Sequence, residues 1–153
     1  MVHLHVRSQY SLLNGVMSLS TIIENAKNKD IAAVCLSDFH SMHGSYNFYK
    51  LCVKNAIKPL LGLEVRVIEE DEELSFVCIA LDYMGYQDLL RLCSDISLKD
   101  LRCVQLEDLS SYTEHCYTIL LNGGRYEEAL IKEELDRKGF DYDEKIEKVE
   151  VLQ

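Results

Sequence analysis

Apolar segments of strand length alternate along this chain with segments that have helical periodicity. Residues 31–36 form a continuous apolar run, which is typical of a strand buried on both faces. Further strands are predicted at 2–6, 60–67, 74–81, 116–121 and 148–152, and helices after a cap at Ser18 or Ser20, after Gly44, at 86–94 and at 126–138. This alternation predicts an α/β fold with a largely parallel sheet, either open or closed into a barrel.

The charge balance limits what the chain can bind. The 153 residues carry a formal net charge of -10, and the acidic run at 69–73 is interpreted as a solvated turn between two strands. A domain that grips DNA by itself usually presents a basic surface to the phosphates. An autonomous DNA-binding module is therefore disfavoured. The length and composition of the chain separately predict that residues 1–153 form a single domain.

Two further features bear on the compartment. The six cysteines show no close paired spacing and several lie in apolar runs, so we interpret them as small buried hydrophobes in a reducing cell. No apolar run is long enough to span a membrane, and the first residues lack the apolar stretch of a signal peptide. We therefore expect a cytoplasmic protein with no membrane partner.

Four segments have a specific order and content, at 3–15, 36–44, 57–65 and 85–94. They read HLHVRSQYSLLNG, LSDFHSMHG, IKPLLGLEV and GYQDLLRLCS. Together they resemble the N-terminal portion of the polymerase-and-histidinol-phosphatase (PHP) domain of bacterial DNA polymerase III alpha subunits, which are C-family replicative polymerases. The similarity is strongest over roughly the first hundred residues and becomes weaker after Lys99.

The resemblance implies a distorted seven-stranded (β/α) TIM-like barrel, of which this chain would supply about five to six strands. It also implies a DNA-directed DNA polymerase as the parent protein, with Mg²⁺-dependent nucleotidyl transfer in polymerase domains downstream of Gln153. The implied partners are the remainder of the alpha chain and a proofreading exonuclease subunit. DNA would be contacted only through the parent protein.

Active members of the superfamily hold two or three divalent metals at the carboxyl ends of the barrel strands and hydrolyse phosphoesters. Such metals, which would be Zn, Mn or Fe, activate water and offset phosphoryl charge. Residues two apart on a strand share a face, so His3, His5 and position 7 would point the same way. The residual ligands implied by the resemblance are His5, Glu64, His3 and Asp38.

Several positions depart from the metal-binding pattern. Arg7 stands where the resemblance implies a second histidine, Phe39 replaces the histidine of an Asp-His pair, and Asn14 stands where an acid is common. A permanently charged guanidinium cannot ligate a metal. We therefore predict a degenerate metal site with no catalytic residue, in which Arg7 pairs with Glu64 or Asp38 as a salt bridge in place of the metal.

Three functions remain open. The leading one is a structural and assembly module of the polymerase, without a cofactor of its own. The alternatives are a metal-dependent phosphoesterase or 3′-5′ proofreading exonuclease, and a stand-alone interaction module.

The other histidines give weaker signals. His40 and His43 lie before a predicted helix, and His40 could replace the ligand lost at position 39 or could serve an ordinary capping or solvent-exposed role. His115 and Cys116 are adjacent, and neighbouring residues on a strand face opposite ways. A joint thiolate–imidazole site at that position is not expected.

Overall fold

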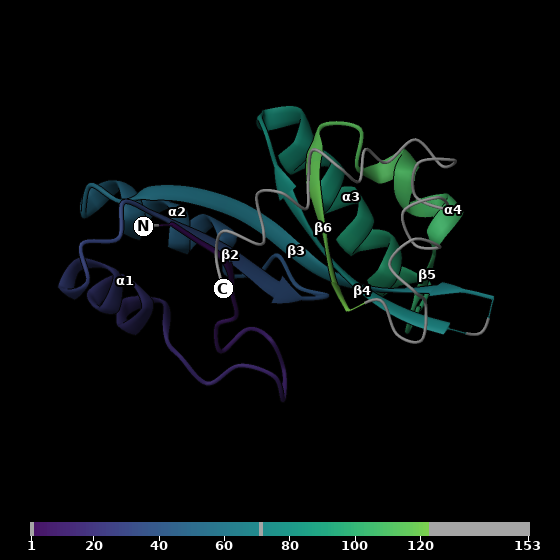
Figure 1. Ribbon diagram of the computed structural model, residues 1–153, viewed down its shortest axis with the longest axis horizontal. Coiled ribbons are helices and arrows are strands. Elements are labelled where there is room, and N and C mark those ends of the chain that lie inside the picture. Colours follow the sequence, from purple (N-terminus) through teal and green to yellow (C-terminus); the bar gives the residue numbers. More distant parts are fainter. Residues whose placement is uncertain (1, 71, 123–153) are drawn as a thin grey trace.

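The computed structural model describes residues 2–70 and 72–122. Its elements are β1 (Val2–Val6), α1 (Leu19–Asn28), β2 (Ala33–Phe39), α2 (Ser45–Lys54), β3 (Lys58–Glu69), β4 (Glu72–Ala80), α3 (Tyr83–Leu98), β5 (Val104–Gln105), α4 (Leu106–Leu109), the 3-10 turn η1 (Ser110–Tyr112) and β6 (Cys116–Asn122). Within this part of the chain the strands form one sheet in the order β1-β2-β3-β4-β6, with β5 beside β3. The sheet curls like half of a barrel, with α1 and α2 towards one end and α3 and α4 towards the other (Figure 1).

The first half of the sheet is parallel, as the alternation predicts. β1 pairs with β2 and β2 with β3, and the intervening helices are α1 and α2. The cap of α1 is Ser18 rather than Ser20, because the Ser18 hydroxyl accepts a hydrogen bond from the Thr21 N–H. Both helices bury apolar side chains, among them Ile22 and Phe48, in a core shared with β2. This packing brings the carboxyl ends of β1 and β2 beside β3.

The second half of the sheet is antiparallel, so the prediction of a largely parallel sheet is wrong there. β4 runs antiparallel to β3, and β6 runs antiparallel to β4. Glu69 pairs with Glu72, and a connection as short as the one between them can join only antiparallel neighbours. The ends of the acidic run therefore belong to strands. α3 covers this half, with Leu89 and Leu92 in the core formed with β3 and β4.

Cysteine burial agrees with the sequence interpretation. Five of the six cysteines are buried and Cys103 is partly exposed. Burial raises the pKa of the Cys35 thiol to about 12 and that of Cys52 to about 11, so both stay protonated at neutral pH. No helix among the described residues is long and apolar enough to cross a bilayer. The helix predicted at 126–138 and the strand predicted at 148–152 lie outside those residues.

Candidate functional site

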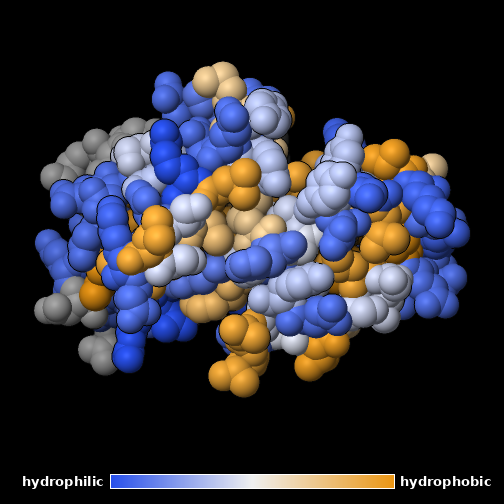
Figure 2. Space-filling view, turned by 180° about the vertical axis from the view of Figure 1, so that it is seen from behind, coloured by the Kyte–Doolittle hydropathy of each residue, from blue (hydrophilic) through white to orange (hydrophobic). Residues whose placement is uncertain are grey.

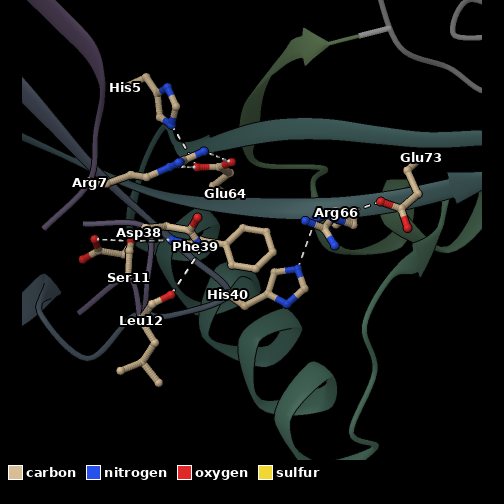
Figure 3. Close-up of polar contacts among 11 residues, drawn as sticks. His5, Arg7, Ser11, Leu12, Asp38, Phe39, His40, Glu64, Arg66 and Glu73 are labelled. Carbon is tan, nitrogen blue, oxygen red and sulfur yellow. Dashed lines mark hydrogen bonds and ion pairs between the residues drawn. The ribbon is translucent and has the colours of Figure 1, made fainter. Parts of the chain in front are cut away.

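The candidate site lies where β1 and β2 end and β3 passes beside them. β1 carries His5, and Arg7 follows its last residue, while β2 ends with Asp38 and Phe39. Glu64 of β3 is the register partner of Phe39, which sets the carboxylate level with the end of β2. Figure 3 shows that His5 and Arg7 point towards Glu64, whereas Asp38 points towards Ser11 of the loop after β1.

Glu64 is a buried carboxylate held by two partners from β1 and its end. Only 2% of the residue is exposed. Arg7 donates two hydrogen bonds, from Nε to Oε2 and from Nη2 to Oε1, each 2.5 Å long, and His5 Nε2 lies 2.9 Å from Oε2. The structure confirms that Arg7 forms a salt bridge, and the partner is Glu64 rather than Asp38. Because β2 lies between β1 and β3, this ion pair ties together two strands that are not neighbours.

The electrostatics of the pair favour the charged forms. Burial opposes ionisation of Glu64, but hydrogen bonds from His5 and Arg7 and the Arg7 charge outweigh burial and hold the Glu64 pKa below its ordinary value. The hydrogen bond to Glu64 raises the pKa of Arg7 further, against the effect of burial. The carboxylate is therefore ionised at neutral pH, and its charge is balanced by a fork-shaped bidentate donor.

Asp38 is saturated by a different set of donors. The residue is 1% exposed, and its Oδ1 accepts hydrogen bonds from the Ser8 N–H at 2.6 Å and the Ser11 hydroxyl at 2.7 Å. Its Oδ2 accepts the Ser8 hydroxyl at 2.7 Å, and the Ser11 oxygen in turn accepts the Phe39 N–H at 2.9 Å. Asp38 thus anchors the loop after β1.

The sequence analysis missed the roles of Ser8 and Ser11. The signal that could have found them is their position: two serines three residues apart directly follow β1, and the aspartate stands near the end of the adjacent parallel strand. A buried carboxylate needs donors, and short hydroxyl side chains of a neighbouring loop are suited to supply them.

His40 and Phe39 form a stacked pair beside the ion pair. Their ring centroids are 4.1 Å apart and the planes differ by 11°, while the Arg66 guanidinium lies 5.4 Å from the Phe39 centroid. His40 Nε2 accepts the Arg66 backbone N–H at 3.1 Å, and the His40 N–H donates to the Glu64 carbonyl. Burial, followed by the Arg66 charge, lowers the pKa of His40. These contacts favour a structural role for His40 over replacement of the lost ligand.

The remaining candidates lie elsewhere. His3 lines a cavity of about 220 Å³ beside α1, together with Val6 and Met17. The Asn14 amide donates to the Leu12 carbonyl in the exposed loop.

The remaining histidines contact other groups. His43 Nδ1 lies 2.9 Å from the Ser41 hydroxyl. His115 lies 3.3 Å from Asp88, while Cys116 donates to the Gly85 carbonyl. Residues 115 and 116 therefore use different partners.

The donor set does not fit a divalent metal. No group of three or more His, Cys, Asp and Glu among the described residues is arranged to hold one. Both Glu64 oxygens face the Arg7 guanidinium, and both Asp38 oxygens accept protein hydrogen bonds. A cation at Glu64 would have to displace a fixed positive charge that is already in place.

Comparison with known proteins identifies the family. The family model described as "PHP domain" matches residues 3–149. The chain belongs to the PHP domain family. This PHP domain is 34% identical over 140 residues to the DNA polymerase III subunit alpha of Halalkalibacterium halodurans and 35% identical over 141 residues to that of Bacillus subtilis. These alignments cover 89% and 84% of this chain, and they span 12% and 13% of the length of the two relatives.

Solved structures support the fold. An amidohydrolase from Chromobacterium violaceum, solved with bound SO4 and no metal, superposes with a TM-score of 0.66 at 13% sequence identity. The superposition covers 92% of this PHP domain and 75% of that chain. At this identity the likeness concerns the fold alone. It agrees with the curled α/β half-barrel of the described residues.

Proposed function

We propose that this chain is the N-terminal PHP module of a bacterial replicative DNA polymerase III alpha subunit, and that its role is structural. The homology to alpha subunits across most of the chain supports the parent protein. The observation that carries the structural role is the bidentate ion pair between Arg7 and Glu64. It fills the position at which a metal-binding member of the family would need free ligand atoms.

The ion pair performs the mechanical task that a metal would perform. A metal bound between strand ends neutralises buried carboxylates and links the strands that carry its ligands. Here Arg7 neutralises Glu64 and joins the end of β1 to β3, while Ser8 and Ser11 satisfy Asp38 and join the loop to β2. In this proposal His5, Asp38 and Glu64 hold the domain together, and neither they nor His3 bind Zn, Mn or Fe.

Catalysis in the parent protein would reside elsewhere. DNA-directed nucleotidyl transfer with Mg²⁺ would take place in downstream domains, and DNA would be contacted through them. The partners of this module would be the remainder of the alpha chain and a proofreading exonuclease subunit, in the cytoplasm. The net charge of -10 agrees with a module that does not grip DNA by itself.

Metal content tests the structural role. The purified chain is exposed to Zn²⁺, Mn²⁺ and Fe²⁺, desalted and analysed by mass spectrometry, beside His5→Ala and Arg7→His. We expect a metal content well below one ion per chain, unchanged by His5→Ala. Arg7→His is the informative comparison because it removes the cation and adds an imidazole, so it should bind more metal than the wild type. A tightly held ion that is lost on His5→Ala would contradict the proposal and favour phosphoesterase or exonuclease chemistry.

A further inference from the structure

The loop between β1 and α1, residues 8–18, exposes large apolar side chains. Leu12 is 82% exposed, Leu13 105% and Val16 96%. Figure 1 shows the loop extending away from the sheet at the bottom of the view. In Figure 2, which shows the molecule from behind, hydrophobic residues protrude from the same lower edge. Exposed apolar side chains that gather on one segment mark an interaction site more often than scattered ones do.

The loop is built to hold this shape. Asp38 fixes its start through Ser8 and Ser11, and the Gln9 N–H donates to the Met17 carbonyl across its base. Gly15 packs so closely that a Cβ there would lie 2.0 Å from the Ser8 carbonyl oxygen. The apolar tip is therefore presented by an ordered, buried anchor rather than by a loose segment.

Leu13 adds a second sign of function. Its backbone φ is 63°, in the left-handed region that is unfavourable for a residue with a side chain. Burial of its own side chain does not offset this strain, because Leu13 is fully exposed in the described fold. A contact that buries the Leu13 side chain would supply the missing compensation.

We propose that the tip of this loop, Leu12, Leu13 and Val16, docks onto an apolar surface of the downstream part of the same polypeptide. The inference rests on the proposed function. The relatives are far longer than this chain, which spans 12% and 13% of them, so most of the homologous polypeptide lies outside the structure. An intramolecular partner is thereby available at high effective concentration.

The chemistry and size of the loop select this partner over others. Residues 8–18 contain no charged side chain in a protein of net charge -10, which disfavours nucleic acid and anionic lipid as partners. Three apolar side chains cover far less than the about 800 Å² per partner typical of stable complexes between separate proteins. A surface of this size suits a tethered contact better than a free dimer.

The test compares thiol reactivity in two forms of the protein. Leu13→Cys is introduced into the full-length gene product and into the 153-residue chain, and alkylation is followed by peptide mass spectrometry. Each rate is normalised to the urea-unfolded protein. The control is Leu98→Cys, because Leu98 is 84% exposed at the end of α3, remote in sequence from the loop. We expect residue 13 to react at least about ten-fold more slowly in the full-length protein, with residue 98 little affected.

The remaining outcomes separate the possible failures. A reading frame that stops after Gln153 would sink the proposed function and this inference together. A longer protein in which residue 13 reacts as fast as in the short chain would overturn the docking site alone. Equal slowing of residues 13 and 98 would show general shielding, and slowing of residue 13 with concentration in the short chain would show a second copy as the partner. Either result contradicts the proposal.

Discussion

Two buried carboxylates near the end of β2 are stabilised in different ways. Glu64 is balanced by a charge, the Arg7 guanidinium, while Asp38 is surrounded by neutral donors from Ser8 and Ser11. Glu64 links two strands through its ion pair with Arg7, and a third of the Arg7 side chain is exposed to solvent. The cluster of Asp38, Ser8 and Ser11 is instead fully buried. Buried carboxylates at strand ends can thus be stabilised by a charged partner or by neutral donors, and this domain uses both.

The comparison predicts that Asp38 matters most for stability. Asp38→Ala leaves the Ser8 N–H and both serine hydroxyls buried without their acceptor, so the free energy of unfolding should fall by about 4 kcal/mol. Urea unfolding measures this change, and hydrogen exchange in residues 8–18 should accelerate. The matched control is Asp82→Ala, which removes a single capping bond to the Gly85 N–H and should cost about 1 kcal/mol. Equal losses of unfolding free energy for Asp38→Ala and Asp82→Ala would contradict the larger contribution assigned to Asp38.

The ion pair should contribute less. Arg7→Ala strands the Glu64 carboxylate with only His5 as a partner, and we expect a loss of about 2 to 3 kcal/mol in urea unfolding, because Arg7 is partly solvated. Lys99→Ala serves as the control, since Lys99 forms an exposed pair with Asp95 and such pairs contribute about 0 to 1 kcal/mol. No difference between the two variants would contradict the role assigned to Arg7.

The Glu64 carboxylate also allows a pH test of the ion pair between Arg7 and Glu64. The Glu64 pKa is depressed in the folded state, so its contribution is complete above the ordinary glutamate pKa of about 4.3 and is lost as pH falls through the folded value. The stability difference between wild type and Arg7→Ala should therefore be constant near neutral pH and shrink in acid. Urea unfolding between neutral and acidic pH measures it. A difference that grows in acid would reverse the assigned sign.

Removing both charges together should have the smallest effect. The double variant Arg7→Met/Glu64→Leu leaves no unpaired charge behind, and buried ion pairs are often replaced by apolar side chains at little cost. We expect its free energy of unfolding to lie within about 1 kcal/mol of the wild type. A larger loss of unfolding free energy than in Arg7→Ala would contradict this expectation. It would mean that the attraction between the two charges itself stabilises the fold strongly.

The elements that were predicted correctly depend on local signals. The apolar run at 31–36, the cap at Ser18 or Ser20 and the glycine before α2 are signals that act over a few residues. The strand is found shifted to Ala33–Phe39, the cap is Ser18, and α2 begins directly after Gly44. The pairing of Arg7 with a buried acid was also predictable, because a fixed cation among strand-end carboxylates must find a partner.

The features that were missed have two kinds of cause. The antiparallel direction of β4 was already implied by the sequence, because the strands predicted at 60–67 and 74–81 are separated by too few residues for a parallel crossover, and the alternation pattern alone does not consider that length. The saturation of Asp38 depends on two serines about thirty positions away along the chain, and no periodicity reports such a contact. His3 lines a cavity beside α1, and no sequence pattern indicated that position.

Thermal unfolding with and without metal tests the central claim most directly. A metal that binds only the folded chain raises the unfolding midpoint in proportion to its affinity, and Mn²⁺ avoids the affinity of Zn²⁺ for cysteines in the unfolded chain. If Arg7 takes the place of a metal, the wild type should unfold at the same midpoint temperature in Mn²⁺ and in chelator. Glu64→Gln should likewise show no difference between the two conditions. A rise with Mn²⁺ in the wild type that disappears in Glu64→Gln would show that the site still holds a metal.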